Sequence, residues 1–324
     1  MTQHDGSTLP AHRPDTSGQT PEVRAVSGPS STNVSGPSST KRPWMPPLLY
    51  ALGLLAMYLF AVYTPVGQRA ENGIFNSSEA GSLDAWFYPL SGSELDSTPM
   101  PPMGQSAEPT LMVGLAVLVV LALVGRYWWR GCAALAIVVL TAGGGEVLHK
   151  VLPRPDLVNA PENLVFQGFP SGHATVPAAL TLAAVLVVAP RIRPYVAAIG
   201  VLWLACTASV SATMGGHRPS DVLGATLIAC TCSALATWLV PLLPRAAAPD
   251  VMPIPRALPA VVLALSAALA LVCGARDDSL TRSLTSGATG FVCVALVWYA
   301  AVILPSRLAQ TAGRAPRPRR APDL

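Results

Sequence analysis

Long uncharged apolar runs constrain this chain more than any other feature of its sequence. The runs are roughly 16 to 25 residues long, enough for a helix to cross the hydrocarbon core of a bilayer. They are continuously apolar rather than alternating, which favours helices over a β-barrel. With 51% hydrophobic and 12% charged residues, the 324-residue chain is also too apolar for an ordinary soluble globule. The sequence therefore predicts an all-α, polytopic membrane helical bundle.

We expect about eight transmembrane helices, one for each apolar run. The runs span approximately residues 46–65, 109–126, 131–149, 173–189, 194–213, 221–243, 256–274 and 286–305. The last two runs carry no Asp, Glu, Lys, Arg or His in their interior and predict scaffold or interface helices. Gly143-Gly144-Gly145 lies within an apolar run and predicts a close contact with a neighbouring helix.

The segments between the runs suggest how the chain is divided. Residues 1–43 are rich in Ser, Pro, Thr and Gly and predict a disordered tail. No apolar signal-peptide core precedes the first run, so we expect that run to be an uncleaved signal anchor. We expect a first helix with a long loop at 44–108, a core at 109–243, two additional helices at 244–306 and a basic tail at 307–324.

Lys and Arg in the connections predict the orientation. One side of the runs carries Lys41, Arg42, Arg126, Arg130, Arg191, Arg193, Arg245 and Arg256, followed by the basic tail. The opposite side begins with the 66–108 connection, where Arg69 is outnumbered by Glu71, Glu79, Asp84, Glu94, Asp96 and Glu108. We therefore expect a cell-membrane protein with both termini cytoplasmic. The connections at 150–172 and 214–220 then lie on the extracytoplasmic face.

Those two connections hold side chains suited to binding a phosphate group. Arg154 offers a planar fork of donors that matches phosphate oxygens, and Lys150 offers a point charge. Ser171 and Gly172 open a predicted helix, where unpaired backbone N–H groups can hold an anion. Glu146 lies four residues before Lys150, so a helical ion pair is its plainest interpretation.

Two histidines and an aspartate could carry out chemistry on that phosphate. If Pro219 takes the first helical position, the Asp221 carboxylate can reach back to the preceding turn. A carboxylate on one nitrogen of His217 would fix its tautomer and leave the other nitrogen free to attack. His173 is then available to protonate the leaving oxygen.

These residues resemble the motifs of the type 2 phosphatidic acid phosphatase (PAP2) superfamily, which includes the vanadium haloperoxidases. Pro170-Ser171-Gly172-His173 matches its second box in full, His217-x3-Asp221 the core of its third box, and Arg154-Pro155 the end of its first. The resemblance covers roughly residues 109–243 and implies a PAP2-like catalytic core.

The resemblance also implies a mechanism for a lipid phosphatase. His173 would be the general acid and His217 the nucleophile, oriented by Asp221, with a phosphohistidine intermediate and no metal or other cofactor. Lys150, Arg154, Ser171 and Gly172 would hold the phosphate. Polyprenyl diphosphate, phosphatidate and phosphatidylglycerol phosphate all fit as substrates.

Two positions depart from the family pattern. The family lysine lies seven residues before the arginine, at Val147 here, whereas Lys150 lies only four before Arg154. The third-box arginine, six residues before the histidine, is replaced by Ser211, and we expect Arg218 to take over its contact with phosphate.

Other functions and partners follow less directly from the sequence. A non-catalytic or weakly active protein that binds or transports a lipid phosphate is the alternative, supported by Ser211, and transfer of a phosphoryl group to an acceptor other than water is a third. Basic residues scattered in short loops and one tail give no case for nucleic acid, so we expect membrane lipids and the lipid phosphate as the partners. Cys230-Thr231-Cys232 has no accompanying His or second Cys pair, which favours core packing over a metal site.

Overall fold

The computed structural model describes residues 44–75, 108–126, 128–160, 168–213, 217–239, 254–275 and 280–307. Every regular element in these ranges is helical, which confirms the all-α prediction. Lys41–Leu324 form one compact unit, and all of the described residues belong to it.

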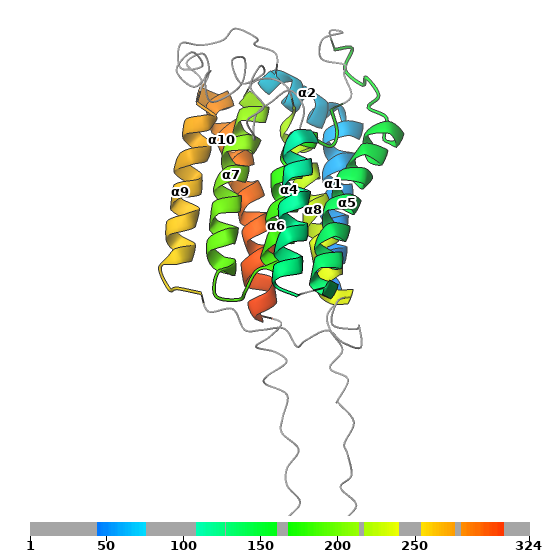
Figure 1. Cartoon of the computed structure of the whole chain (residues 1–324). Helices are drawn as coiled ribbons and strands as arrows, with labels where there is room; N and C mark the ends of the chain where they lie inside the picture. The colour runs from blue at the N-terminus through cyan, green and yellow to red at the C-terminus, as the bar shows by residue number, and fades with distance from the viewer. Residues whose placement is uncertain are drawn as a thin grey trace, which may run out of the picture. The chain divides into compact units, whose positions relative to one another are not determined.

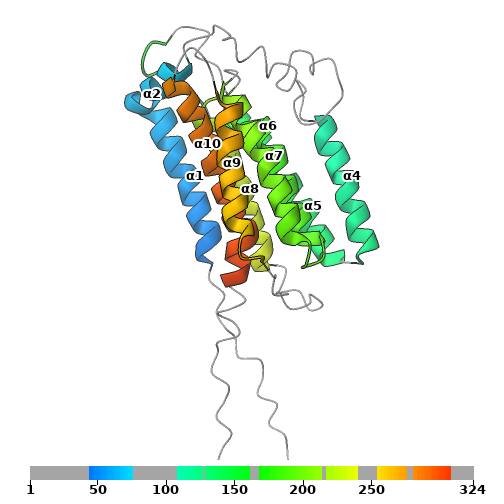
Figure 2. The ribbon, with the colours of Figure 1, turned by 90° about the vertical axis from the view of Figure 1, so that its left-hand side faces the viewer.

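The long helices run up and down the bundle in turn, so that consecutive helices are roughly antiparallel (Figures 1 and 2). The helices are α1 (Met45–Tyr63), α2 (Pro65–Phe75), α4 (Glu108–Val124), α5 (Trp128–Val151), α6 (Gly172–Val187), α7 (Arg193–Thr213), α8 (Pro219–Leu239), α9 (Leu258–Cys273) and α10 (Leu280–Trp298), which continues into a π-helical turn at Tyr299–Ile303. Because α1, α5 and α7 end where α6, α8 and α10 begin, the predicted site residues share one end of the bundle.

Five described helices are long and apolar enough to cross a membrane, as judged by length and composition alone. They are α1, α5, α7, α8 and α10 with its continuation. Shorter apolar helices, α4, α6 and α9, occupy the other three predicted runs. The pattern indicates a multi-pass membrane protein.

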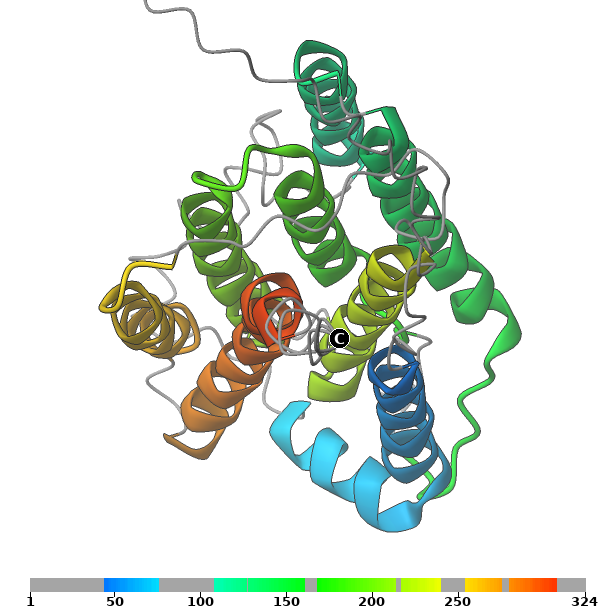
Figure 3. The same cartoon turned by 90° about the horizontal axis from the view of Figure 1, so that it is seen from below.

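The outer surface of the bundle is strongly apolar. Leu49 on α1, Met112 on α4, Val139 on α5 and Val261 on α9 all expose about half or more of their area. Helices α4 and α9 lie at the edge of the bundle when it is viewed from below (Figure 3). An extended apolar surface of this kind is suited to lipid rather than to water.

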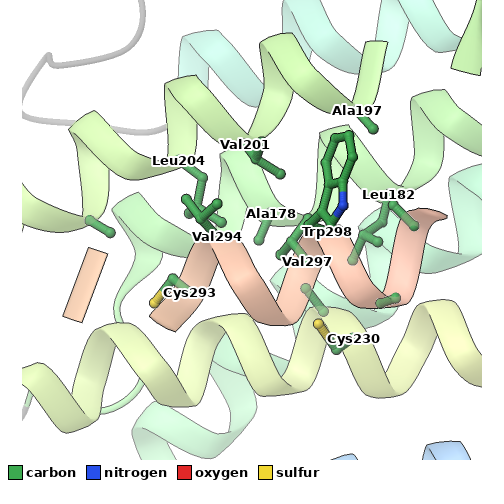
Figure 4. Close-up of a cluster of buried hydrophobic side chains, with 14 of the residues drawn as sticks. Ala178, Leu182, Ala197, Val201, Leu204, Cys230, Cys293, Val294, Val297 and Trp298 are labelled. Carbon is green, nitrogen blue, oxygen red and sulfur yellow. The ribbon is translucent and has the colours of Figure 1, made fainter. Parts of the chain in front are cut away.

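The main core lies between α6, α7, α8 and α10 (Figure 4). Trp298 and Val294 of α10 pack there with Val201 of α7 and with a large set of alanines. Small residues let helix backbones approach closely. Gly200 is one example, because a Cβ there would collide with Thr181. Cys230 is fully buried in this cluster, as the core interpretation of the cysteines predicted.

Three local expectations were wrong. A Cβ on Gly143 or Gly144 would meet nothing within 4 Å, so of the three consecutive glycines only Gly145 lies against a neighbouring segment, at ordinary van der Waals distance from Pro170 and Thr175. Helix α10 begins at Leu280 rather than near 286, which places Arg282 inside the helix, where it is buried.

The third correction concerns the predicted 66–108 loop. Residues 65–75 form helix α2, and the part at 76–107 lies outside the described residues. Figure 3 shows α2 lying beside α8, α1 and α10 at a steep angle to them. This short helix turns out to contact the site.

Candidate active site

Four segments from different parts of the chain meet at one end of the bundle. The loop after α5 supplies Arg154, and the start of α6 supplies His173. His217 lies just before α8, whose first turn carries Asp221. Helix α2 contributes Glu71, which contacts both Arg154 and the start of α8.

The two histidines predicted to carry the chemistry lie next to each other. The ring centroids of His173 and His217 lie 5.7 Å apart, with the ring planes inclined at 56°. The His217 side chain is 18% exposed, and His173 is half-buried. Both rings are therefore close enough to act on one bound group.

Asp221 ties the two histidine boxes together. Helix α8 begins at Pro219, as predicted, and Oδ2 of Asp221 accepts a 2.9 Å hydrogen bond from the backbone N–H of Arg218. The same Oδ2 lies 4.0 Å from Nδ1 of His217, longer than a hydrogen bond. The backbone carbonyl of Asp221 accepts from Ser171 N–H at 2.9 Å, which fixes the start of α6 against the start of α8.

Arg154 is the central cation of the site. Its Nη2 lies 2.6 Å from Oε2 of Glu71, and its Nη1 lies 3.7 Å from Oδ1 of Asp221. The Arg154 side chain is only 6% exposed. The loop that carries it is held by the Tyr58 hydroxyl, which donates to the carbonyl of Pro153 at 2.8 Å.

The start of α6 is arranged as a helix N-terminus open to a ligand. The fully buried Ser171 is the N-cap, and its Oγ accepts a 3.4 Å hydrogen bond from Ala174 N–H. Gly172 is exposed, and a Cβ added there would meet nothing within 4 Å. An anion can therefore approach the first N–H groups of this helix closely.

The structure does not bring Lys150 into this network. Its Nζ lies 2.9 Å from Oε1 of Glu146, and the two side chains are 70% and 63% exposed. The pair is the i,i+4 helical ion pair that the spacing indicated. Its predicted phosphate contact would require the side chain to leave Glu146.

Arg218 and Ser211 occupy the region where the third-box arginine is missing. The Arg218 side chain is fully buried, and its Nη2 lies 3.5 Å from Oδ1 of Asn72. The carbonyl of Ser211 accepts a 3.1 Å hydrogen bond from His217 N–H. The Arg218 guanidinium thus reaches α2, and the negative charges of Asp221 and Glu71 act on it.

Burial controls the charge of His217. It lowers the pKa of the imidazole from 6.5 to about 4, with smaller contributions from the positive charges of His173 and His149 when protonated, while a backbone hydrogen bond to Gly168 acts in the opposite direction. His217 is therefore neutral at pH 7, the state in which an imidazole can attack. Burial and Arg154 likewise lower the pKa of Arg218, against Asp221 and Glu71.

Several buried polar atoms at the site lack a hydrogen-bond partner among the described residues. They are Nη1 of Arg154, Nδ1 of His217, Oγ of Ser220 and Oδ1 of Asp221. Buried polar groups are almost always hydrogen-bonded in folded proteins, and a polar ligand at this end of the bundle could bond to these four atoms together.

Sequence reasoning missed the contribution of α2. Gln68, Glu71 and Asn72 all contact the site or its loop, and their i, i+3, i+4 spacing places them on one helical face. That spacing indicates a short helix with one polar face. The segment lies between the first apolar run and a long polar stretch, so the sequence predicts a loop there. Nothing in it indicates which distant groups it would meet.

Comparison with known proteins identifies a domain within this chain. Searches of curated proteins and of solved structures gave no match. Residues 127–245 match the family model of the PAP2 superfamily. The matched range runs from α5 to α8 and contains Arg154, His173, His217 and Asp221, whereas α2, α4, α9 and α10 lie outside it. The chain therefore carries a PAP2 superfamily domain at residues 127–245.

Proposed function

We propose that this protein is a membrane-embedded, metal-independent phosphatase that hydrolyses a lipid phosphate or diphosphate through a phosphohistidine intermediate. The observation that carries the proposal is the pair of adjacent rings, His173 and His217, beside the buried Asp221 and Arg154. The PAP2 domain supports a phosphatase-type chemistry. The apolar helices that surround the site favour a substrate with a lipid tail over a soluble ester.

In the first step, Nε2 of neutral His217 attacks phosphorus, and an N–P bond forms as the P–O bond to the leaving group breaks. Asp221 orients the ring through Nδ1, for which the 4.0 Å separation must shorten by about 1 Å to reach hydrogen-bond distance. His173 gives its proton to the leaving oxygen.

In the second step, water attacks the phosphohistidine and the N–P bond breaks. His173, now neutral, accepts a proton from that water and returns to its starting state. His217 regains its lone pair, and phosphate leaves the site. Arg154 and the N–H groups at the start of α6 stabilise the charge on the phosphate oxygens in both steps.

We further propose that the site faces the outside of the cell. The support is the distribution of Lys and Arg, which places the connections carrying the site opposite the positively charged flanks. Polyprenyl diphosphate, phosphatidate and phosphatidylglycerol phosphate types all suit a site at the membrane surface. Both termini would then be cytoplasmic.

The test is substitution of the proposed nucleophile in purified protein. His217→Ala should abolish phosphate release from a panel of lipid phosphates in detergent. It should also abolish labelling of the protein by substrate carrying radioactive phosphorus. Release from this variant at near wild-type rates would refute the proposal.

A second candidate function is binding or transport of a lipid phosphate without hydrolysis. Ser211, at the position of the third-box arginine, favours it because one phosphate-binding cation of the family is absent there. In that case the wild-type protein would bind lipid phosphate yet form no phosphohistidine and release no phosphate. Transfer to an acceptor other than water would give a phosphohistidine whose phosphoryl group leaves only when acceptor is added.

A further inference from the structure

Glu71 places a carboxylate where two donors of the site converge. Its Oε2 bonds to Nη2 of Arg154 at 2.6 Å, and its Oε1 accepts from the backbone N–H of Ser220 at 3.0 Å. The Glu71 side chain is 9% exposed, although α2 lies outside the matched PAP2 domain. One side chain thus binds a guanidinium and a helix N-terminus with its two oxygens.

Those donors are the kinds that bind phosphate oxygens. A guanidinium and the N–H groups of a first helical turn both bind oxyanions, because such an anion can accept several hydrogen bonds at once. The Oγ of Ser220 is buried at the same turn and has no hydrogen-bond partner among the described residues. The Glu71 carboxylate therefore leaves the Ser220 hydroxyl without an acceptor, and a larger oxyanion in the same place could accept its hydrogen bond.

The two ends of the Arg154 fork point to different neighbours. Nη2 is bonded to Glu71, whereas Nη1 has no hydrogen-bond partner among the described residues and lies 3.7 Å from Asp221, the residue next to the His217 ring. One guanidinium can therefore serve two adjacent anions. The anion at Nη1 lies beside the reacting histidine, and the anion at Nη2 lies beside the first turn of α8.

We infer that the position held by the Glu71 carboxylate is a second phosphate subsite, so that the substrate is a lipid diphosphate. This inference rests on the proposed function. The phosphate that His217 attacks binds between the histidines and Nη1 of Arg154. The other phosphate displaces Glu71 and binds Nη2 of Arg154 together with the N–H and Oγ of Ser220.

Charge supports an exchange of one anion for another at this position. Arg154 pairs with both Glu71 and Asp221, and the charge of Arg218 interacts with the same two carboxylates, so two positive side chains balance two negative ones in the described network. A phosphate adding to that balanced group gains little from long-range attraction, but one that replaces Glu71 takes over two existing contacts. A single phosphate at the histidines has no need to move Glu71.

Titration of purified full-length protein with two inorganic probes tests the inference without requiring turnover. Inorganic phosphate reports on the histidine subsite alone, and inorganic diphosphate reports on both. Glu71→Gln removes the carboxylate charge that competes with the second phosphate for Arg154 and Ser220. Diphosphate should therefore bind about tenfold more tightly, because it no longer has to displace a bound anion. Phosphate affinity should change less than about twofold. Glu108→Gln removes an exposed carboxylate on α4 and should change neither affinity.

A second variant keeps the inference testable if Glu71→Gln does not fold. Ser220→Ala removes a hydroxyl that has no partner in the described residues, so the fold should tolerate it. It should weaken diphosphate binding severalfold and leave phosphate binding unchanged. Equal shifts for the two probes in either variant, or no shift in both variants, would overturn the second subsite.

Failure of this inference differs from failure of the proposed function. If wild-type protein hydrolyses lipid phosphates but shows no diphosphate-specific shift, only the subsite is refuted. If the shift is present but His217-dependent hydrolysis is absent, the hydrolytic function is refuted and the binding site remains.

Discussion

His173 and His217 come from different helices, yet their ring centroids lie only 5.7 Å apart. His173 is the second residue of α6, and His217 lies just before α8. The backbone hydrogen bond from Ser171 N–H to the carbonyl of Asp221 locks the two helix starts together. The spacing of the rings is therefore set by the backbone and not only by side-chain packing.

The adjacent rings of His173 and His217 are predicted to have separate roles, which substrates with different leaving groups can distinguish. His173→Gln should reduce hydrolysis of an alkyl phosphate by about 10²–10⁴-fold, the usual contribution of a general acid. The loss should be much smaller for a nitrophenyl phosphate, because that leaving group departs without a proton. His217→Gln should lose activity on both, since the nucleophile itself is missing.

Steady-state rates for the two substrates with each variant provide the measurement. Equal losses for both substrates in His173→Gln would show that His173 does not protonate the leaving group. Labelling of the protein during turnover of the nitrophenyl substrate should persist in His173→Gln and disappear in His217→Gln.

Much of this site could be predicted because its signals are local. The start of α8 at Pro219 with Asp221 at the third position is a capping pattern that can be read from adjacent residues, and the structure forms that hydrogen bond. The pairing of Glu146 with Lys150 likewise depends only on helical spacing. Chain direction through the apolar helices then brings the boxes to one end of the bundle.

The contribution of α2 could not be predicted in the same way. Gln68 bonds to the carbonyl of Pro155 and Glu71 to Arg154, and both partners lie more than eighty residues away in the chain. Such contacts depend on how α1 ends and how the short helix packs on the bundle. Gly143 and Gly144 show the opposite error: they belong to a glycine run that is typical of close helix contact, yet a Cβ on either would meet nothing within 4 Å.

The different surroundings of Arg154 and Lys150 predict different consequences of losing each cation. Arg154→Lys keeps the charge but loses the fork, and should weaken phosphate binding by about 1.5–3 kcal/mol, which is roughly 10- to 150-fold. Lys150→Gln removes an exposed charge and should change KM by less than about fivefold, an effect that decreases with added salt.

KM and inhibition by inorganic phosphate at two salt concentrations would check this prediction. A large, salt-independent loss in Lys150→Gln would mean that Lys150 leaves Glu146 and binds the phosphate directly. Glu146→Gln is the matched control, because it breaks the same ion pair without removing the cation.

The lowered pKa of His217 predicts an acid-sensitive component of stability. The folded protein resists protonation of this ring until about pH 4, whereas the unfolded chain takes up the proton near 6.5. The two states bind protons equally above pH 7, so stability is unaffected there. As the pH falls from 6.5 to 4 the unfolded state gains the proton first, and stability is lost by about 3 kcal/mol.

Unfolding midpoints of wild-type protein and His217→Asn in detergent, measured from pH 7.5 to 4, isolate this component. The wild-type midpoint should fall more steeply with decreasing pH than that of the variant, because only the wild type carries the titrating ring. Parallel curves would show that His217 is not held neutral by its surroundings.

Phe169 lies between helix α8 and the segment that carries His173, so a methyl group added to α8 at Gly224 should affect both stability and activity. The Phe169 ring is fully buried and lies 5.0 Å from the ring of Tyr58, centroid to centroid. A Cβ on Gly224 of α8 would approach Cε2 of Phe169 to 2.5 Å. Gly224→Ala must therefore displace the ring, at a cost of about 1–3 kcal/mol of stability.

Because Phe169 directly precedes Pro170, the same displacement should shift the start of α6 and lower kcat. Gly143→Ala is the matched control: it adds the same methyl group to a helix, meets nothing within 4 Å, and should stabilise the helix by about 0.5–1 kcal/mol without changing kcat. Thermal unfolding in detergent and steady-state rates measure both effects. Wild-type stability and rate in Gly224→Ala would show that Phe169 can move without carrying His173 with it, and that the second box is positioned by the hydrogen bond to Asp221 alone.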